Sequence, residues 1–144
     1  MKNSHTKHYT ILWADDDPDD LMIMREVLQG AEDDHHTIIE VDNGRKVLDY
    51  LQQTSNTQCF PCLIVLDMNM PVLSGRETLA LIKSDKNFCS IPVVVFTTSA
   101  SELDRMFCKR HGAEMITKPP TFTSFQEVVQ RLLNFCTASE VVQR

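Results

Sequence analysis

The chain has 144 residues, of which 42% are hydrophobic and 24% charged, and its net charge at pH 7 is −6. That length gives one domain with a real core, and the acidic balance argues against a nucleic-acid-binding surface. The first eight residues lack the apolar core of a signal peptide, and no apolar run approaches the length of a membrane span. The five scattered cysteines predict a reducing compartment, the cytoplasm, with no disulfide framework.

Short apolar runs that suit buried strands alternate along the chain with segments of helical periodicity. In chain order, strands are expected at residues 9–14, 37–41, 63–66, 93–96 and 115–117. Helices are expected at 18–30, from Asn43-Gly44, from Ser74 or Gly75, at 101–110, and in a last segment ending near Cys136. Strands alternating five times with helices predict an α/β fold, a doubly wound five-stranded parallel sheet with five helices on its two faces.

Local signals refine the ends of these elements. Asp17 followed by Pro18 is typical of a helix start, and Thr123 with Gln126 is consistent with a capping box on the last helix. A polar loop is expected at 52–61. The domain boundaries follow in order: a flexible N-terminus at 1–8, the folded domain at 9–136, and a tail or helix extension at 137–144.

Polar side chains stand at the carboxyl ends of four expected strands. They are Asp15 with Asp16, Asp67, Thr97 and Lys118. In a parallel sheet these ends lie along one edge, where open α/β sheets bind ligands. Clustered carboxylates repel one another, so the pattern predicts a bound cation, and a few hard oxygen ligands favour Mg²⁺. A carboxylate can also act as a nucleophile toward a phosphoryl group, with the lysine and threonine stabilising its oxygens.

These motifs resemble the receiver domains of bacterial two-component response regulators. The segments that carry the resemblance are Ile11-Leu12-Trp13-Ala14-Asp15-Asp16-Asp17-Pro18, Leu66-Asp67-Met68-Asn69-Met70-Pro71 with Gly75, Val95-Phe96-Thr97-Thr98-Ser99 and Thr117-Lys118-Pro119. The acidic turn at Asp17 and the Thr-Thr-Ser segment look most like single-domain regulators related to those that serve bacterial phytochromes. The resemblance implies a flavodoxin-like fold with strand order 2-1-3-4-5.

The resemblance also implies roles. Asp67 would accept a phosphoryl group from a histidine kinase in a Mg²⁺-dependent reaction. Asp15, Asp16 and Asp67 would hold the metal, with the backbone carbonyl of Asn69 as a further ligand. The chain would then be a phosphoacceptor signalling protein and not an enzyme, acting through phosphorylation-dependent contacts with an unidentified output protein.

Thr97 and Lys118 would contact the phosphoryl group, and the peptide bond from Lys118 to Pro119 would be cis. The partners implied are a sensor histidine kinase or a phosphotransfer protein, with no nucleic acid and no membrane. Receivers commonly form dimers through the face of the fourth helix, fifth strand and fifth helix. Apolar residues there line that face or belong to the core, namely Leu103, Phe107 and Phe122.

Several neighbouring residues have simpler interpretations. Asp19 and Asp20 suit the first turn of a helix, where negative charge is favoured, so they are left out of the site. Trp13 suits core packing. The segment Cys59-Phe60-Pro61-Cys62 has thioredoxin-like spacing, but it precedes a strand, whereas redox pairs usually stand at a helix N-terminus. Met115 departs from the family, which usually has Tyr or Phe at this position.

Two other functions compete with this interpretation. A haloacid-dehalogenase-like phosphatase also uses an aspartyl nucleophile and Mg²⁺, but it carries a second acid two residues after the nucleophile, where this chain has Asn69. A purely structural interaction module that is never phosphorylated would have no need of the whole set of strand-end side chains.

Overall fold

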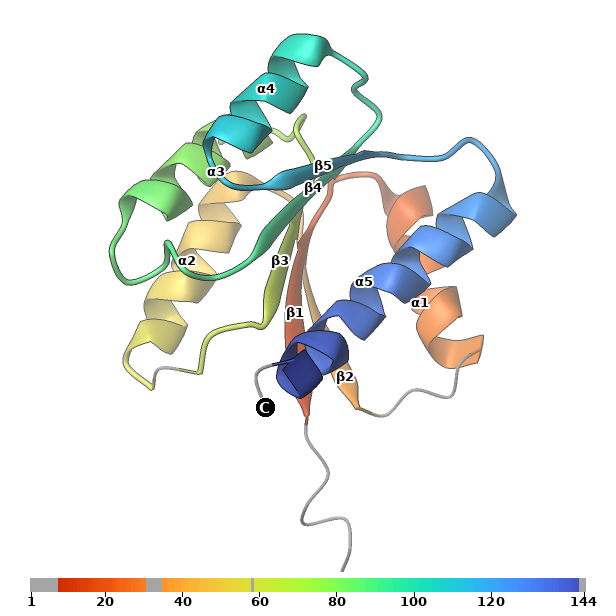
Figure 1. Cartoon of the computed structure of the whole chain (residues 1–144), viewed down its shortest axis with the longest axis horizontal. Coiled ribbons are helices and arrows are strands. Elements are labelled where there is room, and N and C mark those ends of the chain that lie inside the picture. The colour runs from red at the N-terminus through yellow and green to blue at the C-terminus, as the bar shows by residue number, and fades with distance from the viewer. Residues whose placement is uncertain (1–7, 31–34, 58, 143–144) are drawn as a thin grey trace, which may run out of the picture.

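The computed structural model describes residues 8–30, 35–57 and 59–142, with side chains as far as residue 136. Five parallel strands form one sheet in the order β2-β1-β3-β4-β5 (Figure 1). The strands are β1 Tyr9–Ala14, β2 His36–Val41, β3 Leu63–Leu66, β4 Val93–Thr97 and β5 Glu114–Thr117. The helices are α1 Pro18–Gly30, α2 Gly44–Ser55, α3 Gly75–Ser84, α4 Glu102–Arg110 and α5 Phe122–Val142. The predicted fold class and strand order are confirmed.

Two helical layers sandwich the sheet (Figure 1). Helices α1 and α5 cover one face, and α2, α3 and α4 cover the other. The central strands β1, β3 and β4 are buried on both faces, which explains their unbroken apolar runs. Trp13 is 1% exposed and packs edge-on against Phe96, so its predicted core role is confirmed. Among the described residues, no helix is long and apolar enough to cross a membrane.

Side-chain caps fix where most helices begin. Asn43 caps α2, and Ser74 forms a complete capping box with Glu77 on α3. The capping box predicted at the start of the last helix is wrong. Thr121 precedes α5 and its hydroxyl accepts the Ser124 N–H at 3.2 Å, because the helix begins earlier than the sequence pattern indicates. The loop expected at 52–61 is also shorter, since α2 continues to Ser55.

Two further expectations are corrected. Cys62 and Cys136 form a disulfide, whereas the odd number of cysteines predicts none. The pairing escapes sequence reasoning because the two residues lie 74 positions apart and meet only when α5 packs on the sheet. No peptide bond in the described residues is cis, so the bond between Lys118 and Pro119 is trans. The trans form is favoured for an X–Pro bond by only about 0.5–1 kcal/mol.

Candidate functional site

The carboxyl edge of the sheet carries the predicted site residues. Asp15 and Asp67 directly follow β1 and β3. Thr97 is the last residue of β4, and Lys118 directly follows β5. Backbone hydrogen bonds continue the strand ladders through them: the Asp67 N–H donates to the Ala14 carbonyl at 3.0 Å, and the Lys118 N–H to the Thr97 carbonyl at 2.7 Å. The sheet itself therefore positions these side chains.

The Lys118 ammonium group lies among three carboxylates. Its Nζ is 2.7 Å from Asp15 Oδ2, 2.7 Å from Asp20 Oδ2 and 2.9 Å from Asp67 Oδ2. The lysine side chain is only 5% exposed. The sequence predicts that a cation balances the acidic cluster, and the ammonium supplies one positive charge against these three negative charges. The negative charge that remains attracts a further cation.

Burial and charge pairing act in opposite directions on these groups. Burial raises the pKa of the Asp15 carboxyl from 3.8 to about 6, and hydrogen bonds from Lys118 and the Asp17 N–H offset only part of that rise. Burial by itself lowers the pKa of Lys118, but its hydrogen bonds to the three carboxylates outweigh burial and raise it above its ordinary value. At pH 7 the lysine is therefore charged and Asp15 is mostly ionised.

Asp15, Asp16 and Asp67 form a group that suits a small cation. One carboxylate oxygen from each lies within 4.8 Å of the others, with Asp16 exposed and the other two buried. The Asp17 N–H donates to Asp15 Oδ1 at 2.9 Å and the Asn69 N–H to Asp67 Oδ1 at 3.3 Å, which orients both buried carboxylates. This all-oxygen donor set, open to solvent at Asp16, fits Mg²⁺, which keeps several of its waters.

The loop between β3 and α3 is held closely behind Asp67. A Cβ at Gly75 would overlap the Asp67 carbonyl oxygen, so the position requires glycine. The Gly75 N–H donates to the Met68 carbonyl at 2.9 Å. In the same loop, Val72 has a φ of 68° and is 79% exposed. A positive φ is a genuine outlier for a β-branched residue, so this loop stores backbone strain next to the site.

Thr97 is fully buried and connects the site to the loop before α4. Its Oγ1 accepts the Ser99 N–H at 3.4 Å. Ser99 Oγ donates to Asp104 Oδ2 at 2.7 Å, and Arg76 pairs with Asp104 Oδ1 at 2.7 Å. The Ser99 hydrogen bond and then the Arg76 contacts lower the pKa of Asp104. The loop after β4 is thereby attached to both α3 and α4.

Asp20 contacts the Lys118 ammonium at the site, although its sequence position predicts only a helix-dipole role. It stands in the first turn of α1, and its side chain is 16% exposed as it contacts Lys118. A first-turn acid is favoured by the helix dipole in any helix, so its residue type alone does not indicate a site. The signal available was positional: α1 begins at the same sheet edge as the other carboxylates.

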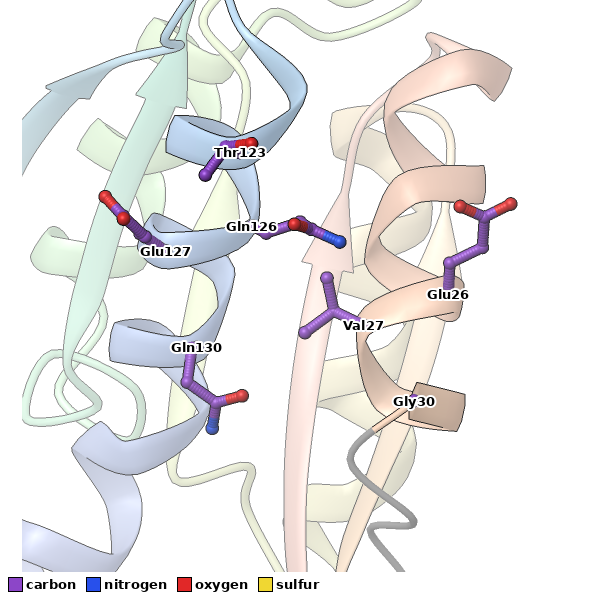
Figure 2. A pocket seen from close by; sticks show the side chains of 7 residues that line it. All are labelled: Glu26, Val27, Gly30, Thr123, Gln126, Glu127 and Gln130. Carbon is purple, nitrogen blue, oxygen red and sulfur yellow. The ribbon is translucent and has the colours of Figure 1, made fainter.

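A hollow lies between α1 and α5, away from the carboxyl ends of the strands (Figure 2). Its lining residues are Glu26, Val27, Gly30, Thr123, Gln126, Glu127 and Gln130. This lining has no basic side chain and no thiol, and Figure 2 shows the side chain of Glu26 pointing away from α5. This hollow therefore lacks the lysine that the predicted phosphoryl chemistry requires.

The comparison with protein families agrees with this geometry. The family described as response regulator receiver domain matches residues 11–130. The chain belongs to this family. Rcp1, a response regulator of Synechocystis sp., is 42% identical over 138 residues, which cover 94% of this receiver and 93% of Rcp1. PilH of Pseudomonas aeruginosa is 29% identical over 110 residues, covering 76% of this receiver and 84% of PilH.

Solved receiver structures share the whole fold. The phosphorylated cyanobacterial phytochrome response regulator RcpA superposes with a TM-score of 0.82 at 32% identity, covering 92% of this receiver and 96% of RcpA. The Mn²⁺-bound form of Rcp1 superposes with a TM-score of 0.79 at 33% identity, covering 88% and 93% of the two chains. The predicted likeness to phytochrome response regulators is confirmed.

The exposed fractions of the apolar side chains on α4, β5 and α5 show which of them belong to the core. Leu103 on α4 is 72% exposed and Phe122 at the start of α5 is 49% exposed, so neither is core. Phe107 is partly buried, and the Arg76 guanidinium lies 4.2 Å from the centroid of its ring. Met115, at the usual aromatic position, is 6% exposed within the core on the α4 side of the sheet.

Proposed function

We propose that this receiver accepts a phosphoryl group on Asp67 from a phosphohistidine of a sensor kinase or phosphotransfer protein. The observation that carries the proposal is the convergence of Asp15, Asp67 and Lys118, with Lys118 Nζ within 2.9 Å of both carboxylates. Mg²⁺ would be held by Asp15, Asp16 and Asp67, with the Asn69 carbonyl as a further ligand. The relative Rcp1 has been solved in a Mn²⁺-bound form, which supports binding of a divalent cation by this receiver too.

In this reaction each side chain of the site would have a separate role. Asp67 supplies the attacking carboxylate oxygen, which its hydrogen bonds from Lys118 and the Asn69 N–H keep oriented. The Lys118 ammonium turns from the carboxylates to the incoming phosphoryl oxygens and stabilises their charge. The Thr97 hydroxyl donates its hydrogen to another of these oxygens, and its Oγ1 can still accept the Ser99 N–H. When bound, Mg²⁺ neutralises charge that builds up on the phosphoryl oxygens.

The test is covalent labelling with a small phosphodonor. Incubation with acetyl phosphate and Mg²⁺ followed by intact mass should show an acid-labile adduct of about 80 Da, the mass of the phosphoryl group that Asp67 accepts. Asp67→Asn should abolish the adduct, whereas Asp49→Asn, a change at an exposed helical carboxylate, should leave it unchanged. An adduct of normal yield on the Asp67 variant would disprove the assignment, and steady turnover of a phosphate ester would support the phosphatase alternative.

Signalling would follow from contacts with another protein in the cytoplasm. The exposed apolar side chains of Leu103 and Met106 belong to α4, and that of Phe122 to the start of α5. Receivers commonly form dimers through the face of α4, β5 and α5. We expect beryllofluoride with Mg²⁺ to change the association of this face, either with a second copy or with an output protein. Light scattering at several protein concentrations, with Leu103→Ser as the comparison, tests the dimer.

A further inference from the structure

The disulfide joins the start of β3 to the C-terminal half of α5. The Cα atoms of Cys62 and Cys136 are 5.9 Å apart. Cys136 is 3% exposed and Cys62 is partly buried, and both pack in the cluster between α5, α1 and the sheet. The other cysteines are free thiols, with Cys59 and Cys89 exposed and Cys108 buried. Cys62 is the more exposed of the two bonded cysteines, so a small thiol reaches the bond more easily at Cys62 than at Cys136.

The same two chain segments are connected a second time at the receiver site. Strand β3 leads from Cys62 to Asp67, and α5 follows Lys118 after a short turn (Figure 1). Asp67 and Lys118 pair at 2.9 Å at the carboxyl end of the strand. The disulfide closes the opposite end, where Figure 1 shows the end of α5 beside the start of the sheet. It therefore holds the helix that follows Lys118 against the strand that precedes Asp67.

We propose that Cys62 and Cys136 are a reversible thiol–disulfide site that controls how firmly α5 is held to the sheet, a function beyond phosphoryl acceptance. The bond forms by exchange with a low-molecular-weight disulfide such as oxidised glutathione. One cysteine thiolate displaces a glutathione thiol and forms a mixed disulfide, and the second cysteine thiolate then displaces the other glutathione. Two cysteine thiols are oxidised, one glutathione disulfide is reduced to two thiols, and the cysteine protons end on the released glutathione.

The free thiols argue for a reversible bond and against a permanent structural bridge. Cys59 and Cys89 are exposed free thiols, which is typical of a reducing compartment, and the disulfides found in such a compartment are usually transient or redox-sensing. The buried site also tolerates the reduced form, since a thiol packs as a small hydrophobic group. Both redox states therefore suit the same cluster, and the covalent tether is what distinguishes them.

The experiment equilibrates the whole chain in glutathione buffers that range from mostly oxidised to mostly reduced. Free thiols are then alkylated, and the peptide that links Cys62 to Cys136 is quantified by mass spectrometry. The linked peptide should predominate in the oxidised buffer and fall at least about tenfold in the reduced one. Amide hydrogen exchange in α5 from Leu132 onward should become about tenfold faster after reduction, because the tether no longer limits local opening.

Variants separate the pair from the other thiols. Cys62→Ser should show fast α5 exchange in every buffer, and Cys89→Ser, a change at an exposed free thiol, should behave as wild type. The exchange comparison on wild type alone decides the proposal if the first variant folds poorly. Three results for the linked peptide would overturn the proposal: the link never forms, it survives the reduced buffer, or a Cys59–Cys62 link forms in its place. The proposal would also be overturned if amide exchange in α5 were the same in the oxidised and reduced buffers.

Discussion

Asp20 Oδ2 lies 2.7 Å from Lys118 Nζ, and this pair joins the first turn of α1 to the residue that follows β5. Asp20 is outside the group of carboxylates that suits a cation. It would therefore remain a partner for the ammonium if a cation bound to the other carboxylates. The pair therefore ties Lys118 to α1 through a carboxylate other than Asp15 and Asp67.

Asp20→Ala should lower the free energy of unfolding more than Asp19→Ala does, by about 1–2 kcal/mol, because only Asp20 contacts the buried ammonium. Both acids stand in the first turn of α1, so the loss of helix-dipole stabilisation is shared between the two variants. Urea unfolding in EDTA at pH 7 measures the difference. Equal destabilisation would mean that the Asp20 contact contributes nothing beyond the helix dipole.

Mg²⁺ should raise the melting temperature of wild type, because a ligand that binds only the folded state stabilises it by mass action, by about 2.7 kcal/mol at one hundred times its Kd. Asp16→Asn should weaken this effect and raise stability in EDTA, since Asp16 adds negative charge that Lys118 does not contact. Thermal melts across a magnesium titration provide the measurement, with Asp19→Asn as the exposed control. If millimolar Mg²⁺ leaves the melting temperature unchanged, the proposed metal site is wrong.

The stability of the metal-free protein should fall as pH rises from about 4 to about 6. Burial raises the pKa of Asp15 from 3.8 to about 6 in the folded state, so in this window the folded chain holds a proton that the unfolded chain releases. The raised pKa therefore favours folding at low pH, and the advantage, at most roughly 3 kcal/mol, is lost above the folded pKa. Asp15→Asn should flatten this part of the profile. Urea unfolding in EDTA at several pH values tests the slope, and an unchanged slope in the variant would assign it to another group.

Val72→Asn should raise the free energy of unfolding by about 1 kcal/mol, because asparagine tolerates the left-handed backbone that valine resists. The valine side chain is 79% exposed, so little packing is lost. Urea unfolding gives the comparison, with Val72→Ala as a control that removes the exposed branch without favouring a positive φ. If the strain is part of how the loop presents Asp67, the asparagine variant should also change the rate of labelling by acetyl phosphate.

Met115→Tyr should increase the difference between the unphosphorylated and phosphorylated forms of the receiver. Methionine is flexible and fills the buried site on β5 without a single rigid rotamer. The unphosphorylated and phosphorylated arrangements of the receiver should therefore differ less in energy with Met115 than with the Tyr or Phe that is usual in the family. The variant should show a larger difference in dimerisation or partner affinity between its free and beryllofluoride-bound forms. If wild type shows the larger difference, Met115 does not reduce the energy difference between the two forms, and the prediction is wrong.

The sheet and most of its edge chemistry could be predicted because both depend on local patterns. Unbroken apolar runs give the buried strands, and the polar residue after each run must lie at the shared edge, as Asp67 does. What escaped prediction depends on long-range packing. Asp20 has two equally good local explanations until α1 is placed beside Lys118, and the start of α5 at Phe122 precedes its apolar stripe.

The covalent ring from Cys62 to Cys136 encloses β3, β4 and β5 and leaves β1 and β2 outside it. If the oxidised chain is pulled by its termini, the residues inside the ring cannot extend. At about 3.3–3.6 Å per residue, the 74-residue separation shortens the fully extended chain by roughly 250 Å. Asp67, Thr97 and Lys118 would stay inside the unextended ring, while Asp15 and Asp16 would be drawn away with β1. Mechanical load would therefore separate Asp15 and Asp16 from Asp67, Thr97 and Lys118, and so divide the group of three carboxylates that suits a cation.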